Sequence, residues 1–132
     1  MAGNADMVAF IEARLAEEER VALDAGGANW RCPADVPGEV HDRTSGIAFT
    51  VRDAGYDRHI ALQDPARTVA RIETNRVLLS EYVEIAERDT DRPEEDFTSG
   101  RAVGLGFAVR QLAAEYASHP DYTAKWLPRF IR

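Results

Sequence analysis

Residues 64–87 of this sequence, DPARTVARIETNRVLLSEYVEIAE, decide how the chain folds. Asp64 followed by Pro65 is typical of a helix start, because aspartate caps free backbone N–H groups and proline at the first helical position needs none. Apolar residues then recur at helical spacing. They are Val69, Ile72, Leu79, Val83 and Ala86, with Leu78, Tyr82 and Ile85 beside them. The stretch therefore predicts one amphipathic helix over about residues 65–87.

Two other stretches carry the same helical spacing. A helix is predicted over about residues 5–24, with Gly26-Gly27 as its stop signal. Its apolar face consists of Val8, Ile11, Leu15 and Ala22. Another helix is predicted over about residues 100–118, ending before Pro120, because the residue preceding a proline disfavours helical geometry. Its apolar face consists of Ala102, Leu105, Val109, Leu112, Ala113 and Tyr116.

Between the first two helices the pattern changes to that of strands. Residues 47–51, IAFTV, are rich in β-formers, and Asp53-Ala54-Gly55 is a turn signal. Tyr56 to Ala61 can return as a third strand, and Trp30-Arg31-Cys32 is a short extended piece. An antiparallel β-ribbon or three-stranded sheet is therefore predicted over about residues 29–61.

The remaining segments complete one predicted domain. Residues 88–99, RDTDRPEEDFTS, are polar and acidic and predict a loop, and residues 121–132 predict a C-terminal cap. A two-stranded ribbon is marginal in water, so it must lie against helices. The predicted fold class is a helix-dominated α+β fold, with about three main helices and a small antiparallel sheet in a single domain over residues 1–132.

Composition and charge exclude several classes of protein. The chain has 132 residues, of which 45% are apolar and 30% charged, and its net charge is −7. Direct nucleic-acid binding needs a basic surface, and this balance argues against it. Apolar runs fall far short of the ~20 residues that span a membrane. The N-terminus lacks the pattern of a signal peptide, and the single cysteine, Cys32, cannot form an intrachain disulfide. A cytoplasmic protein outside the membrane is predicted.

The residues suited to chemistry form no known catalytic or metal motif. His41, His59 and His119 are scattered without the spacing of metal ligands. Cys32 has no base nearby in the sequence. Gly104-Leu105-Gly106 lacks the third glycine and the strand–turn–helix setting of a dinucleotide loop, so its glycines are interpreted as permitting close approach of another element. No metal, cofactor or catalytic residue is predicted.

One group of polar residues is a candidate ligand site. Its members are His59, Asp64, Arg67, Arg71, His119, Asp121 and Tyr122. Arginines near a helix start can bind phosphate groups, and a histidine with an aspartate can transfer protons. Structural interpretations stay open beside these roles. Asp64 can be a helix cap, the arginines can be solvated ion pairs, and His119-Pro120 can stop a helix before a capping Asp121 and a packed Tyr122.

The end of the chain gathers large apolar side chains. They are Trp126, Leu127, Phe130 and Ile131, all within six residues. They either close the core or form a surface for association with another chain.

Several strings along the chain stand out together. They are Val8-Ala9-Phe10-Ile11-Glu12-Ala13-Arg14-Leu15, Trp30-Arg31, His59-Ile60-Ala61, Asp64-Pro65-Ala66-Arg67, Ile72-Glu73, Arg76, Tyr82, Leu112-Ala113, Tyr116-Ala117, His119-Pro120-Asp121-Tyr122 and Trp126. Over most of the chain they resemble a family of small, uncharacterised actinobacterial and actinophage proteins, a domain of unknown function. The resemblance implies an intracellular setting and no established activity, cofactor or catalytic residue.

Three hypotheses about function follow. The leading one is a non-enzymatic protein-interaction or accessory module that binds another protein or a second copy of itself, and its support is the apolar C-terminal end. An alternative is a small-molecule binder or enzyme with a site near His59, Arg67 and His119. A further alternative is an acidic phage- or defence-related protein that acts on a DNA-binding partner.

Overall fold

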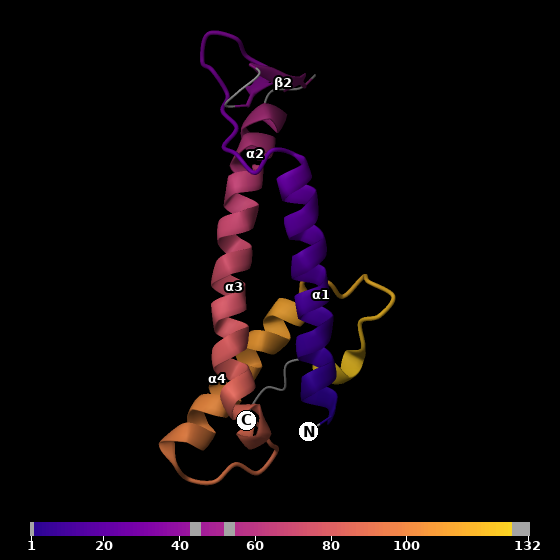
Figure 1. Ribbon diagram of the computed structural model, residues 1–132, viewed down its shortest axis with the longest axis vertical. Coiled ribbons are helices and arrows are strands. Elements are labelled where there is room, and N and C mark those ends of the chain that lie inside the picture. Colours follow the sequence, from indigo (N-terminus) through magenta and orange to yellow (C-terminus); the bar gives the residue numbers. More distant parts are fainter. Residues whose placement is uncertain (1, 43–45, 52–54, 128–132) are drawn as a thin grey trace. The chain divides into compact units, whose positions relative to one another are not determined.

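The computed structural model describes residues 2–42, 46–51 and 55–127, which fall into two compact units. The helical unit comprises Met1–Ala16 and Thr74–Arg132, and the ribbon unit comprises Glu17–Glu73. Two long helices, α1 (Ala2–Asp24) and α3 (Pro65–Ile85), contribute residues to both units (Figure 1). The described residues form four α-helices and a two-stranded antiparallel sheet, which confirms the helix-dominated α+β class. A single domain over the whole chain stays a prediction.

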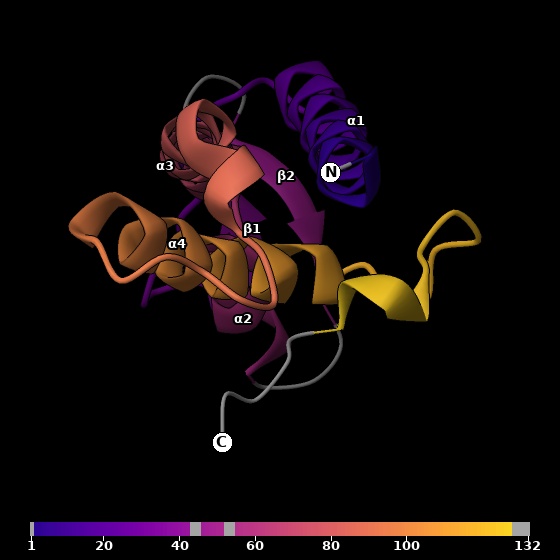
Figure 2. The same ribbon diagram turned by 90° about the horizontal axis from the view of Figure 1, so that it is seen from below.

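The helical unit contains the first part of α1, the second part of α3, and α4 (Phe97–Ala114). Two short 3₁₀ helices, η1 (Ala86–Arg88) and η2 (Ala124–Trp126), complete it. Figure 2 shows α4 lying across one side of the α1 and α3 segments. Their inward faces form the core. Its buried apolar residues include Met7, Ile11, Leu15, Leu79, Tyr82, Ala102, Val109 and Ala113, so the predicted inward faces are largely confirmed.

α3 departs from its prediction at its C-terminal end. Val83, predicted on the core face, is 54% exposed, because Leu79 and Tyr82 occupy the inward side and Val83 is turned away by about 100° from Tyr82. The α-helix ends at Ile85, and the last predicted turn tightens into η1.

α4 begins earlier and ends earlier than the predicted helix over residues 100–118. It begins at Phe97 because Oδ1 of Asp96 accepts a hydrogen bond from the Ser99 backbone N–H at 2.7 Å. That hydrogen bond holds the pKa of the Asp96 carboxyl below its usual range. After Ala114 the chain continues in tight turns, such as the one closed by the His119 N–H and the Tyr116 carbonyl at 2.9 Å.

The ribbon unit contains the hairpin of β1 (Glu39–His41) and β2 (Ile47–Thr50), in which Val40 lies opposite Phe49. Val40 is buried, as are Ala22 of α1 and Ile72 of α3. Residues 30–32 are not a strand of this sheet. They contribute an isolated bridge, in which Arg31 and His41 exchange backbone hydrogen bonds of 2.9 and 2.8 Å.

The prediction of a third strand at Tyr56–Ala61 is wrong, because Tyr56–Leu62 forms the helix α2. Tyr56 and Ile60 are four residues apart, a spacing that suits a helix as well as a strand. Gly55 precedes the helix at a φ of 96°. The Asp57 side chain accepts hydrogen bonds from the backbone N–H groups of Arg58 at 2.9 Å and Gly38 at 3.2 Å, and the first of these does most to lower the pKa of its carboxyl.

Candidate functional site

α4 has two faces of largely apolar character on opposite sides of the helix. The inward face consists of Ser99, Ala102, Gly106, Val109 and Ala113, which are all buried. The outward face consists of Phe97, Gly100, Gly104, Phe107 and Gln111, which are all exposed. Phe97 is 85% exposed and Phe107 is 40% exposed. A helix that is apolar all round is expected to be buried all round, so an open outward face calls for an explanation.

Charge is almost absent from α4. Its charged residues are Arg101 and Arg110, and both make ion pairs. Arg101 contacts Glu81 of α3, and Arg110 points into the helical unit toward Asp89. The five residues of the outward face therefore carry no charge, and the exposed Arg101 at the edge of this face is paired with Glu81.

The glycines of α4 differ in their surroundings. At Gly106 a Cβ atom would lie 2.6 Å from Cγ of Asp89 and 2.7 Å from Nη1 of Arg110, so only glycine lets Asp89 approach the helix. The interpretation that these glycines permit close approach of another element is thus confirmed at Gly106 but not at Gly104. At Gly100 and Gly104 a Cβ would meet nothing within 4 Å among the described residues. Glycine inside a helix costs about 0.5–1 kcal/mol relative to alanine, and the described fold gives no reason for these two.

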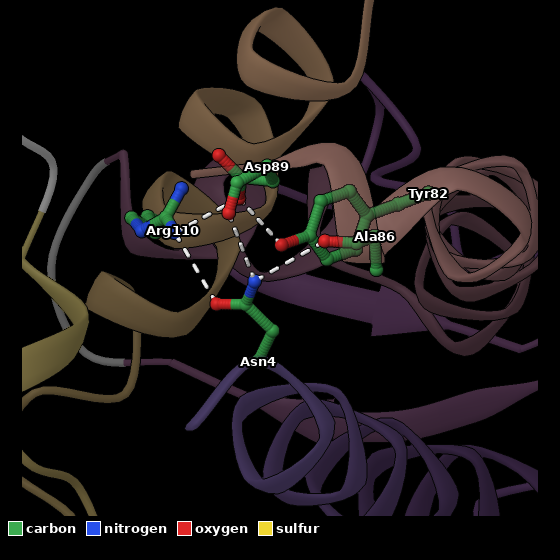
Figure 3. A network of polar contacts seen from close by, with 5 residues as sticks. All are labelled: Asn4, Tyr82, Ala86, Asp89 and Arg110. Carbon is green, nitrogen blue, oxygen red and sulfur yellow. Dashed lines mark hydrogen bonds and ion pairs between the residues drawn. The ribbon is translucent and has the colours of Figure 1, made fainter. Parts of the chain in front are cut away.

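Four side chains from separate segments form a buried polar network in the helical unit (Figure 3). The Tyr82 hydroxyl donates to Oδ2 of Asp89 at 2.6 Å, and Nη2 of Arg110 lies 2.9 Å from the same oxygen. The side-chain nitrogen of Asn4 donates to the carbonyls of Ala86 and Asp89, each at 3.4 Å. Its oxygen accepts from Arg110 at 3.4 Å. The network thereby joins the start of α1, the end of α3, and α4.

Burial keeps the Tyr82 hydroxyl of this network protonated. Desolvation, the hydrogen bond to Asp89 and the charge of Asp89 together raise the pKa of the Tyr82 phenol far above its usual range, so its hydroxyl stays a donor. The Asp89 side chain is 6% exposed and that of Arg110 is 17% exposed. A carboxylate so deeply buried needs both a cation and hydrogen-bond donors, and these neighbours provide them. We interpret the network as structural.

The ribbon unit has an open groove of about 420 Å³. Its lining consists of Glu17, Glu18, Val21, Ala22, Ala25, Trp30, Gln63, Pro65 and Thr68. α1 ends beside it because Gly26 and Gly27 adopt φ angles of 98° and 65°, and the Gly27 N–H donates to the Ala22 carbonyl at 2.9 Å. The Trp30 ring packs edge-on against Phe49, with 5.4 Å between ring centroids. These turns and contacts fix one wall of the groove.

Asp64 joins that wall to the start of α3. Its Oδ1 accepts from the Arg67 N–H at 2.8 Å, which confirms the predicted cap. Its Oδ2 accepts from the Trp30 N–H at 3.0 Å, and nearby the Ala66 N–H donates to the Ala28 carbonyl at 3.2 Å. Asp64 is buried, and both its oxygens accept from backbone groups. The structural interpretation of Asp64 is therefore favoured over ligand binding.

We expect Asp64→Ala to lower the free energy of unfolding by about 2–4 kcal/mol. The lost cap accounts for about 1 kcal/mol, and the Trp30 N–H left without its acceptor accounts for about 1–3 kcal/mol more. Urea unfolding followed by circular dichroism measures the loss. Asp96→Ala is the matched control, because Asp96 caps α4 through Ser99 and otherwise makes only an exposed ion pair with Arg88, so its loss should cost only about 1 kcal/mol. Equal losses in the two variants would contradict the double role of Asp64.

The other candidate residues of the ribbon unit lie outside the groove's lining. His59 is exposed on α2, and Arg67 is exposed in the first turn of α3. Arg71 forms an ion pair with Glu18 of α1.

The candidate residues His119, Tyr122 and Trp126 pack around one aromatic ring of the helical unit, that of Phe10. The ring centroids around it lie at 5.5 Å for His119, 6.2 Å for Tyr116, 6.1 Å for Tyr122 and 5.0 Å for Trp126. Nδ1 of His119 also accepts from the Asp121 N–H at 3.0 Å. This packing favours a structural role for His119 and Tyr122, but His119-Pro120 does not stop the helix, because α4 already ends at Ala114. A ligand site shared with the candidate residues of the ribbon unit stays a prediction.

The residues of the predicted C-terminal surface differ in their surroundings. Trp126 packs against Phe10 and against Tyr122, whose ring centroid lies 5.7 Å from that of Trp126. Trp126 therefore contributes to the fold of the helical unit. Leu127 is 54% exposed. Phe130 and Ile131 lie outside the described residues.

Comparison with known proteins places most of the chain in one family. The profile of the "Family of unknown function (DUF6221)" matches residues 4–128. No curated protein and no solved structure matches the chain. In the part of the chain that the structure describes, no helix is long and apolar enough to cross a membrane.

Proposed function

The chain belongs to the DUF6221 family, whose function is unknown, and we propose that it is a protein-interaction module that self-associates through the outward face of α4. The observation that carries the proposal is the open, uncharged face of Phe97, Gly100, Gly104 and Phe107. Exposed apolar surface of this kind is typical of contact sites between proteins. The face supports association without implying any chemistry.

The order of residues on this face suits a two-fold interface. Phe97, Gly100, Gly104 and Phe107 read the same in both directions along the helix, with their centre at residue 102. In a two-fold dimer residue i contacts residue j, and j contacts i. Two antiparallel α4 helices would therefore place Phe97 level with Phe107 of the second copy, and Gly100 level with Gly104.

The glycines give this arrangement its physical reason. Without side chains at Gly100 and Gly104 two helix backbones can approach closely, and the phenylalanines at each end can then bury their rings against one another. Self-association would thus explain two glycines that weaken α4 and that no contact within the described residues requires.

The test is the double variant Gly100→Ala/Gly104→Ala. Two alanines separate the paired backbones, and we expect the dimer dissociation constant to rise at least about tenfold, which corresponds to about 1.4 kcal/mol. The same change should stabilise the monomer against urea by about 1–2 kcal/mol, since alanine favours the helix. Sedimentation equilibrium measures the first effect and urea unfolding of the dilute protein measures the second.

Gly3→Ala is the matched control. Gly3 lies in α1 with open space around its Cβ position, so this change should leave the dimer dissociation constant as it is. Unchanged self-association in the double variant would contradict the proposal. So would a wild-type chain that stays monomeric at about 1 mM, the concentration at which even weak specific pairing is populated.

The cellular setting is also a proposal. We place the chain in a cytoplasmic, reducing compartment, and the support is its single cysteine, Cys32. The resemblance to actinobacterial and actinophage proteins supports an origin of that kind. Thiol labelling that found Cys32 oxidised in cells would contradict the compartment.

A further inference from the structure

We infer that the ion pair between Arg101 of α4 and Glu81 of α3 decides which partner the α4 outward face accepts. Glu81 neutralises the charge that two copies bring together at their two-fold axis, so a copy that carries the intact pair is accepted and one without Glu81 is repelled. Two copies meet in this way only if they pair as proposed above, so the inference rests on the proposed function.

Arg101 borders the outward face of α4 close to the centre of its symmetry. It follows Phe97 by four residues and precedes Gly104 by three, and residues three or four apart are neighbours on the surface of a helix. Val103 occupies the mirror position on the other edge, because 101 and 103 are equally far from the centre at residue 102. One edge of the face therefore carries a charge and the other an apolar side chain.

Two-fold symmetry brings like edges together. In an antiparallel pair of helices the two-fold axis runs across both helices and keeps each edge on its own side, so Arg101 of one copy faces Arg101 of the second copy. Both arginines lie one residue from the centre, which separates their Cα atoms by only about 3 Å along the helix direction. Packed helix axes are about 8–10 Å apart. The two long cationic side chains therefore come within reach of one another.

Glu81 compensates the charge at this point. Its carboxylate contacts the Arg101 guanidinium, and the side chains of Arg101 and Glu81 are 40% and 48% exposed, so a second copy can reach both. The other charged residue of α4, Arg110, points into the helical unit toward Asp89. An ion pair as exposed as that of Arg101 and Glu81 adds little to the stability of a single chain. Across a two-fold axis, the same pair replaces repulsion between two arginines by attraction between opposite charges.

The experiment compares dimer dissociation constants of charge variants by sedimentation equilibrium, at about 20 mM and about 500 mM NaCl. We expect Glu81→Gln to raise the constant about threefold at the lower salt concentration, as two unit charges about 7 Å apart in water repel by about RT. The difference should vanish at the higher concentration, because salt screens exposed charges. Adding Arg101→Gln to Glu81→Gln removes the repelling charge and should restore the wild-type constant.

Glu12→Gln is the matched control. Glu12 is an exposed glutamate of α1 in the same unit, and its removal changes the net charge of the chain by the same amount as Glu81→Gln. We expect the dimer dissociation constant of this variant to equal that of the wild-type chain at both salt concentrations. An equal effect of Glu12→Gln and Glu81→Gln would contradict the inference, since net charge alone would then explain the change.

Mixing two single variants tests the choice of partner directly. A Glu81→Gln chain brings the cation without its carboxylate, and an Arg101→Gln chain brings the carboxylate without the cation. Each kind repels itself and attracts the other across the axis, so mixed dimers should clearly exceed the half, roughly, that random pairing gives in an equimolar mixture at low salt. Native mass spectrometry with one chain ¹⁵N-labelled distinguishes the three kinds of dimer.

The outcomes separate this inference from the proposed function. A wild-type chain that stays monomeric at about 1 mM overturns both. A dimer that Gly100→Ala/Gly104→Ala weakens but Glu81→Gln leaves unchanged supports the α4 interface and overturns the role of the ion pair. Random mixing of the two charge variants overturns that role as well. So does a loss of equal size at low and high salt, since it would indicate altered packing instead of charge.

Discussion

Arg110→Met is expected to lower the free energy of unfolding by about 3–5 kcal/mol. The guanidinium of Arg110 lies 2.9 Å from Oδ2 of Asp89, whose side chain is only 6% exposed. Without it the carboxylate stays buried with the Tyr82 hydroxyl as its remaining side-chain donor. A buried charge without its counter-ion is among the most destabilising features of a protein. Urea unfolding of the dilute protein, followed by circular dichroism, measures the loss.

Arg101→Met is the matched control for this prediction. It removes the other arginine of α4, whose ion pair with Glu81 joins side chains that are 40% and 48% exposed. Such a pair contributes about 0–1 kcal/mol. Adding Asp89→Asn to Arg110→Met removes the unpaired charge and should restore part of the lost stability. Equal losses for Arg101→Met and Arg110→Met would contradict the structural role of the network.

Phe10→Ala is expected to cost about 3–5 kcal/mol, the range for deleting a buried phenylalanine ring. Phe10 is 7% exposed and lies between four rings of the segment 116–126, with Trp126 the nearest at a centroid distance of 5.0 Å. The guanidinium carbon of Arg14 lies 5.6 Å from the same ring. The segment that follows α4 therefore loses its main anchor when the ring is removed.

Hydrogen exchange locates the effect of Phe10→Ala. We expect backbone amides of residues 116–126 to lose protection more than those of the ribbon unit, because the ring contacts belong to the helical unit. Phe97→Ala is the control, since Phe97 is 85% exposed and its removal should change the stability of the dilute protein by no more than about 0.5 kcal/mol. Comparable losses of unfolding free energy in Phe10→Ala and Phe97→Ala would contradict the stabilising role of the ring contacts of Phe10.

Local signals in the sequence predicted most of the helices. Asp64 and Pro65 fixed the start of α3, and the Asp64 cap is present at 2.8 Å from the Arg67 nitrogen. The sequence predicted the structure less well where one spacing of apolar residues suits both a helix and a strand, as at Tyr56 and Ile60. The positive φ of Gly55, which precedes α2, could not be known beforehand. The start of α4 was misplaced because Asp96, its cap, lay inside a stretch predicted as loop.

The candidate sites were harder to predict, because they depend on residues far apart in the chain. Nothing in the sequence relates Asp89 to Gly106, yet the carboxylate occupies the space that a Cβ there would need. The second hydrogen bond of Asp64, which it accepts from the Trp30 N–H, joins residues 34 apart in the chain, and no local pattern predicts it. The outward face of α4 did have a local signal, the symmetric spacing of Phe97, Gly100, Gly104 and Phe107. The prediction of this helix used only its inward-facing apolar residues and therefore missed that signal.

Cross-linking across α4 tests whether the chain self-associates through the outward face of this helix. In a Cys32→Ser background, Phe97→Cys and Phe107→Cys chains are mixed and oxidised with glutathione. Antiparallel pairing about residue 102 places these two positions at one level on facing helices, and close approach of the helices at Gly100 and Gly104 brings them together for a disulfide, which needs a Cα separation of about 4.4–6.8 Å. We expect covalent dimers that contain one chain of each kind, and none when either chain is oxidised alone. Absence of the mixed dimer, or equal cross-linking of each chain with itself, would contradict it.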